Sequence, residues 1–285
     1  MTTAADDDRE ARSLEQWFIS ARDRQRAFGD APPQLVVPGA RAMRRLLGPR
    51  GRSLDETTAE MAFWQVFLPS AINSDLADFR SVRQRLPRSF AAVRDGITRS
   101  AAPPQVVFAT FHIAAFHLVA ALVASALEDV CGERGHVLIA RRNMGWLQLQ
   151  AGRWVHDAGQ VLTTDAAGLR QLHRGLRDGS IRRLFILVDG PHPAKPGVHP
   201  LQMLDGSMGF KTGLLTRLLE WGIPILPLVH GWSAGRLAVE WHPRLEPGSG
   251  IQVISDLADG LLRAFPEQWL NWSAVSRFLE PGVSP

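Results

Sequence analysis

The most constraining feature of the sequence is a buried strand that leads directly into a buried helix. Residues 106–111 form a short β-branched and aromatic apolar run, which is typical of a buried strand. The run from Ile113 to Val130 is rich in Ala and Leu and contains no Pro or Gly, which predicts a buried helix. His112 falls at the junction between them. In α/β proteins such junctions, at the carboxyl edge of the sheet, hold reacting groups.

Strand-like and helix-like runs alternate beyond this junction. Further strands are expected at 136–140, 160–163, 184–188, 223–229 and 236–241. Further helices are expected at 145–158, 165–178, 210–221, 251–264 and 266–278. Pro224 and Pro227 favour an edge position or a bulge for the strand that contains them. The alternation predicts an α/β fold with a mixed, largely parallel sheet flanked by helices.

The first hundred residues are mainly helical. Residues 1–12 are polar and acidic and are expected to form a flexible tail. Helices are expected at 13–28, 57–68, 76–86 and 89–100, before an Ala-Ala-Pro-Pro run. We therefore expect a single domain over 13–285, with a helical cap at 13–100 and an α/β core at 101–285, a size that can bury a substantial core.

Composition and charge exclude several kinds of protein. The single Cys131 excludes an internal disulfide and fits a reducing compartment. No signal peptide or apolar run of membrane-spanning length is visible, so we expect a cytoplasmic protein without a transmembrane anchor. The net charge of +4 comes mainly from arginine, because Lys195 and Lys211 are the only lysines. The arginine clusters at 41–45 and 50–52 suit an acidic partner, a phosphate-bearing ligand, a peripheral membrane contact or plain solvent. No nucleic-acid-binding motif accompanies them, so no nucleic-acid partner is expected.

Two histidines are the first candidates for chemistry. His117 follows His112 by five residues, which in an ideal helix places the two side chains ~140° apart. If His112 precedes the first helical turn, the two imidazoles can meet. The alternative is a pair of core histidines, each bonded to a backbone carbonyl. Four other histidines share no metal-ligand spacing, so no metal site is expected: His192, His199, His230 and His242.

Several segments between residues 108 and 270 resemble a known enzyme family. Phe108–His112, with a polar residue five positions after the histidine, is similar to the His-x4-acid motif of the lysophospholipid acyltransferase superfamily. Asp189-Gly190 resembles the Asp-Gln of its lipid A biosynthesis (lauroyl/myristoyl) acyltransferase branch. The run at 266–269 matches the Pro-Glu-Gln-Trp signature of that branch, and weaker similarities occur at 197–201, 213–218 and 222–227.

The resemblance implies an acyltransferase that uses an acyl-carrier-protein or CoA thioester as donor and needs no other cofactor. His112 would be the general base that takes a proton from a hydroxyl or amine. The helix N-terminus disfavours an imidazolium, and its backbone N–H groups could stabilise an oxyanion. Because no membrane anchor is visible, we expect a soluble or carrier-bound small-molecule acceptor, as in natural-product biosynthesis.

The chain departs from the family where the motif acid should be, because His117 occupies that position. We expect His117 to orient His112, although it brings no negative charge. Three explanations stay open: Asp189 or Asp205 supplies the carboxylate, the reaction tolerates a weaker base, or activity has been lost. The alternatives to an acyltransferase are a thioesterase and a catalytically inactive acyl-carrier- or lipid-binding protein.

Basic and aromatic residues complete the expected site. Arg141, Arg142 and Arg153 lie where relatives carry basic residues near the substrate, and Lys211 begins a helix. They are predicted to bind a phosphopantetheine phosphate or an acidic carrier surface, with ordinary surface charge as the alternative. Most tryptophans are expected in the core. Some could line an acyl channel: Trp64, Trp146, Trp154 and Trp269.

Overall fold

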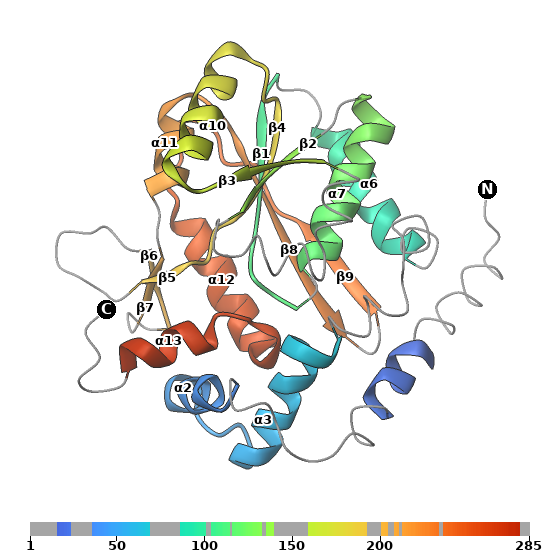
Figure 1. The fold of residues 1–285 in the computed structure, drawn as a ribbon, viewed down its shortest axis with the longest axis vertical. Helices are drawn as coiled ribbons and strands as arrows, with labels where there is room; N and C mark the ends of the chain where they lie inside the picture. Colours follow the sequence, from blue (N-terminus) through green and yellow to red (C-terminus); the bar gives the residue numbers. More distant parts are fainter. Residues whose placement is uncertain are drawn as a thin grey trace.

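A computed structural model describes residues 16–23, 36–68, 86–100, 104–114, 116–132, 135–139, 159–192, 201–204, 208–210, 213–233 and 236–279. Over these ranges the chain forms an α/β fold around a six-stranded sheet of order β3-β2-β4-β1-β8-β9 (Figure 1). The strands are β1 (Val106–Thr110), β2 (Gly135–Ile139), β3 (Gly159–Thr163), β4 (Arg183–Leu187), β8 (Ile225–Ser233) and β9 (Arg236–Trp241). β9 is antiparallel to β8, and the other neighbouring pairs are parallel. The predicted fold class is confirmed.

The central strand β1 is apolar because both of its faces are covered. Val107 and Ala109 point into one hydrophobic core, and Val106 and Phe108 point into the other. The helices that contribute to the first core include α10 (Ala166–Asp178), α11 (Gly213–Glu220) and α12 (Gln252–Ala264). Those that contribute to the second include α6 (Pro87–Ser100) and α7 (Phe116–Cys131). The sheet is therefore the middle layer of three (Figure 1).

Segments from both ends of the chain lie near the edge of the sheet where β1 and β4 end (Figure 1). They are α2 (Val37–Leu47), α3 (Leu54–Ala62), the π-helix η1 (Phe63–Phe67), the 3-10 turn η3 (Pro266–Gln268) and α13 (Trp272–Leu279). α13 packs on α2, and η3 contacts both α3 and η1. A small antiparallel sheet follows β4, with strands β5 (Pro191–His192), β7 (Met208–Phe210) and β6 (Leu201–Met203).

Several predicted boundaries are wrong in ways that matter for the site. α7 begins at Phe116, so a short turn separates His112 from the helix. The helix expected at 266–278 is interrupted between η3 and α13, and Trp269 there bridges to Ile113. Phe210 belongs to β7, and the helix expected from that residue begins at Gly213.

Of the two alternatives expected for strand 223–229, an edge position or a bulge, the edge position is wrong, because β8 lies between β1 and β9. Pro227 is in register with Ala109 of β1, and its carbonyl accepts a hydrogen bond from the backbone N–H of His242 (3.0 Å). The N–H that Pro227 lacks would point to the same side, just beyond the Leu228–Trp241 pair that ends the β8–β9 ladder. The proline is tolerated in an inner strand because the missing donor falls at the end of a ladder.

Other expectations agree with the structure or fall outside it. The predicted cap of α10 is present, since the Asp165 side chain accepts a hydrogen bond from the Gly168 N–H (2.8 Å). The tail at 1–12 and the helix at 145–158 lie outside the described residues, as does 76–85. Across the described ranges, no helix is both long and apolar enough to cross a membrane.

Candidate active site

The register between β1 and β4 brings His112 and Asp189 together. Thr110 and Leu187, the last residues of these parallel neighbours, are paired, and the Val188 N–H donates to the Thr110 carbonyl (2.9 Å). His112 and Asp189 each lie two residues beyond this pair. His112 Nδ1 is 2.6 Å from Asp189 Oδ1. The side chains therefore meet at the carboxyl edge of the sheet, where α/β proteins place their ligands.

Both oxygens of the Asp189 carboxylate have hydrogen-bond donors. Oδ1 pairs with His112 Nδ1, while Oδ2 accepts from the His112 backbone N–H (2.8 Å) and from Trp269 Nε1 (2.5 Å). Asp189 is only 1% exposed, so these bonds replace the water that the carboxylate has lost. They also fix its orientation toward the imidazole.

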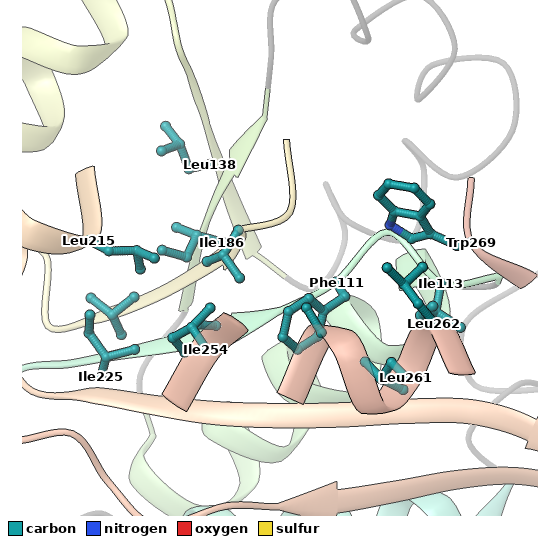
Figure 2. Close-up of a cluster of buried hydrophobic side chains, with 14 of the residues drawn as sticks. Phe111, Ile113, Leu138, Ile186, Leu215, Ile225, Ile254, Leu261, Leu262 and Trp269 are labelled. Carbon is teal, nitrogen blue, oxygen red and sulfur yellow. The ribbon is translucent and has the colours of Figure 1, made fainter. Parts of the chain in front are cut away.

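Apolar side chains fill the space behind this carboxylate. Phe111, Ile113, Leu261 and Leu262 lie beside Trp269 at one end of the hydrophobic cluster (Figure 2). The gap that these residues and Asp189 leave is too small for a water molecule. Dry surroundings strengthen the electrostatic interaction between a carboxylate and a neighbouring imidazolium.

The imidazole of His112 is held by Asp189 and is partly exposed. A carboxylate accepts hydrogen bonds, so the contact with Asp189 places the proton of a neutral imidazole on Nδ1 and leaves Nε2 as a proton acceptor. The side chain is 20% exposed. The backbone carbonyl of His112 accepts a hydrogen bond from the Leu270 N–H (2.8 Å), which ties the turn to the chain after η3.

The segment Gln268–Asn271 connects the elements around the pair. The Gln268 carbonyl accepts from the Ala114 N–H (2.8 Å), and its side-chain amide bonds both the N–H (2.9 Å) and the carbonyl (2.7 Å) of Trp232 in β8. Asn271 Nδ2 donates to the Asp189 carbonyl (2.9 Å). From the sequence, Trp269 was expected in a family signature and among the tryptophans that could line an acyl channel, not as a partner of Asp189. The available signal was the adjacent amide and indole N–H groups of Gln268 and Trp269.

His117 is not the group at Nδ1 of His112, because Asp189 occupies that nitrogen. Phe116 makes edge-to-face contacts with both imidazoles, at centroid distances of 5.4 Å to His112 and 5.8 Å to His117. His117 is 1% exposed; burial, together with the nearby His230, lowers its pKa to about 4. It is therefore neutral at pH 7, and its predicted role in orienting His112 stays a prediction without a direct contact to Nδ1.

His230 is a second buried histidine near the pair, and its residue type was the only signal for it in the sequence. It lies on β8, with Nδ1 3.0 Å from Thr110 Oγ1, and the same hydroxyl donates to the Leu228 carbonyl (2.6 Å). Burial lowers the pKa of His230 to about 4, although the charge of Asp189 acts in the opposite direction.

Three backbone donors of the turn already have partners. The N–H groups of His112, Ala114 and Phe116 donate to Asp189, to the Gln268 carbonyl and to the Ile113 carbonyl, respectively. These three groups are therefore unavailable to an oxyanion, and stabilisation of an oxyanion by other N–H groups of the helix start stays a prediction.

Other predicted site residues fall outside the described residues: Arg141, Arg142, Arg153, Asp205, Lys211, Trp146 and Trp154. The two described tryptophans of the proposed acyl channel are buried, Trp64 at 6% and Trp269 at 1% exposure. Trp64 Nε1 donates to Glu60 (2.6 Å), so each indole N–H has a carboxylate partner. In the part of the chain that the structure describes, no three His, Cys, Asp or Glu side chains are arranged to hold a metal ion.

Comparison with known proteins does not assign this site. No protein-family model matches the chain, and no curated protein is significantly similar to it.

Proposed function

We propose that this chain is an acyltransferase. It moves an acyl group from an acyl-carrier-protein or CoA thioester to the hydroxyl or amine of a soluble or carrier-bound acceptor, in natural-product biosynthesis in the cytoplasm. The observation that carries the proposal is the His112–Asp189 pair, a partly exposed imidazole whose Nδ1 is held by a buried carboxylate. The segments that resemble lipid A acyltransferases supply the choice of reaction.

In the proposed reaction His112 acts as the general base. Nε2 takes the proton of the acceptor O–H or N–H while the acceptor atom forms a bond to the thioester carbonyl carbon. The carbon–sulfur bond then breaks, and the departing thiolate takes the proton back from the imidazolium. Asp189 stabilises the imidazolium between these steps and keeps Nε2 free, as the aspartate of a Ser-His-Asp triad does for its histidine.

The geometry favours one of the three explanations for the missing motif acid. Asp189 lies at Nδ1 of His112 and supplies the negative charge that His117 lacks. Because the general base has a buried carboxylate partner, we expect the chain to be active. Asp205, the other carboxylate considered, lies outside the described residues.

An intact-mass assay of acyl carrier protein tests this proposal. The chain is incubated with an acyl carrier thioester, with and without an added amine or alcohol. Acyl transfer to the nucleophile supports an acyltransferase; free acid in both incubations identifies a thioesterase, and a complex without turnover identifies a binding protein. His112→Ala should abolish turnover while leaving the melting temperature nearly unchanged, and retained activity would refute the base assignment.

A further inference from the structure

Trp269 donates a hydrogen bond to Asp189, the charge partner of His112. Its indole Nε1 donates to Asp189 Oδ2 at 2.5 Å, and its ring is 1% exposed. The other oxygen, Oδ1, is the one that His112 Nδ1 reaches. The indole N–H therefore shares the carboxylate with the imidazole, in surroundings that exclude water.

We propose that Trp269 is a positioning residue for the acyl-transfer site, an inference that rests on the proposed function. Two donors on Oδ2, the Trp269 indole and the His112 backbone, hold the carboxylate so that Oδ1 faces Nδ1. A hydrogen bond to an anion also draws negative charge toward the donor. Trp269 thus limits how strongly Asp189 attracts the proton of His112, in addition to setting where the carboxylate points.

The surroundings of Trp269 keep its ring in place. Its backbone carbonyl accepts a hydrogen bond from Gln65 Nε2 of η1 (3.0 Å), and its backbone bridges to Ile113. Its ring meets Trp272 edge to face at 4.8 Å. Because both the backbone and the ring are fixed, the indole N–H has a constant direction toward Asp189. Donors that support a ligand or catalytic group in this way commonly change activity about 10- to 100-fold when removed.

Trp269→Phe removes the N–H and keeps an aromatic ring, and Trp241→Phe is its control. Trp241 lies in β9, and its Nε1 donates to the Ala92 carbonyl of α6 (3.0 Å) instead of a carboxylate. Labelled histidine allows His112 protonation to be followed by NMR without any substrate. In Trp269→Phe we expect the midpoint of His112 protonation to move upward, because Asp189 then attracts the imidazolium more strongly. The pH profile of kcat/KM should move with it, and Trp241→Phe should change neither.

Equal shifts in both variants, or no shift in Trp269→Phe, would overturn the inference. If Trp269→Phe does not fold, the native protein still provides a test. The indole N–H resonance of Trp269 should follow the protonation of His112 and that of Trp241 should not. An unresponsive Trp269 resonance would equally refute the role. Both NMR readouts are independent of turnover, so a positioning role can be confirmed even where acyl transfer fails.

Discussion

Asp189 and His117 differ in what each can do for His112. A carboxylate accepts a hydrogen bond and stabilises the imidazolium with a full negative charge. A buried neutral imidazole can accept a hydrogen bond, but it offers no charge and resists protonation, since burial and His230 lower the pKa of His117 to about 4. The distance of 2.6 Å from His112 Nδ1 to Asp189 Oδ1 assigns the stronger role to the carboxylate.

Substituting Asp189 and His117 one at a time separates their roles. Asp189→Asn keeps an oxygen for the Trp269 and His112 backbone N–H groups, but it turns an N–H toward Nδ1. His112 then carries its proton on Nε2 and cannot act as a base. We expect kcat to fall by about 10³- to 10⁴-fold, as in triads that lose their aspartate. His117→Gln should change kcat by less than about tenfold, because a residue without contact to Nδ1 does not set the tautomer.

Steady-state assays with an acyl carrier thioester measure both effects, and thermal melts show whether each variant is folded. A larger loss of kcat in folded His117→Gln than in Asp189→Asn would reverse the assignment.

At the level of elements, the pairing of β1 with β4 was the information that the sequence could not supply. The sequence indicated both strands and placed His112 and Asp189 after them. However, β2 and β3 lie between β1 and β4 along the chain, while β1 and β4 are neighbours in the sheet. Strand order arises from long-range packing, and a shift in register would have separated the two side chains.

The break between η3 and α13 escaped prediction for a similar reason. Trp269 and Trp272 are three residues apart and fit one face of a helix. In the structure Trp269 pairs with Ile113 instead, and the Leu270 N–H donates to the His112 carbonyl. A contact with a segment more than 150 residues away therefore outweighs the local helical preference.

The packing of α6 on β9 provides a prediction at this scale. A Cβ added at Gly96 would lie 1.9 Å from Nε1 of Trp241, the atom that donates to the Ala92 carbonyl (3.0 Å). Gly96→Ala must therefore move the indole and break that bond. We expect a loss of about 2 kcal/mol, within the range for overpacked sites.

Gly260 offers the matched control, because it lies within α12 and its added Cβ would meet no atom within 4 Å. Gly260→Ala should instead stabilise the protein by about 0.5–1 kcal/mol through helix propensity. Urea unfolding of both variants measures the difference. Destabilisation by Gly260→Ala as large as that by Gly96→Ala would show that contact with Trp241 is not the cause.

On the scale of the whole molecule, the two ends of the described chain meet at the site. Arg52 pairs with Glu267 (2.8 Å), Gln65 donates to the Trp269 carbonyl, and Arg45 donates to the Leu279 carbonyl (2.7 Å). The sequence assigned the first hundred residues to a helical cap. In the structure the described helices of these residues lie in two places. α2 and α3 lie at the carboxyl edge of the sheet, while α6 packs on α7 and β9.

Global stability should depend on pH through the buried histidines. Burial lowers the pKa of His117 and His230 to about 4, from 6.5 in the unfolded chain. Between these values the unfolded chain binds more protons than the folded chain. The free energy of unfolding is therefore highest above about pH 6.5 and falls as the pH drops toward 4. Protonation of each histidine lowers the free energy of unfolding by on the order of 2–3 kcal/mol over this pH range. His136, whose pKa burial also lowers, acts in the same direction.

Urea unfolding between pH 5 and 7.5 measures this dependence, because most carboxylates titrate at lower pH. His117→Leu should reduce the slope of unfolding free energy against pH while retaining cooperative unfolding. An unchanged slope in the variant would mean that His117 does not contribute.

Five arginines form a positive surface on and after α2: Arg41, Arg44, Arg45, Arg50 and Arg52. It covers the outer side of α2 and the turn that follows, and all of these residues except Arg44 are exposed. Arg50 donates to the Arg263 carbonyl at the end of α12 (2.8 Å), and Arg52 pairs with Glu267 beside the Gln268–Asn271 segment. The surface is thus anchored next to the segment that holds His112, where an acidic carrier protein could present its thioester.

Arg41 and Arg45 are one helical turn apart on α2 and share this surface. If the donor is an acidic carrier, Arg41→Glu combined with Arg45→Glu should raise KM for the carrier thioester by about tenfold, because a positive surface that speeds association becomes negative. KM for a small uncharged thioester should not change, and added salt should raise KM for the carrier in the native protein. Arg170→Glu combined with Arg174→Glu on α10 is the control, since it makes the same change of net charge on a helix that flanks the sheet. An equal rise in KM for both double variants would indicate a general charge effect, and no rise in either would exclude this surface as the docking site.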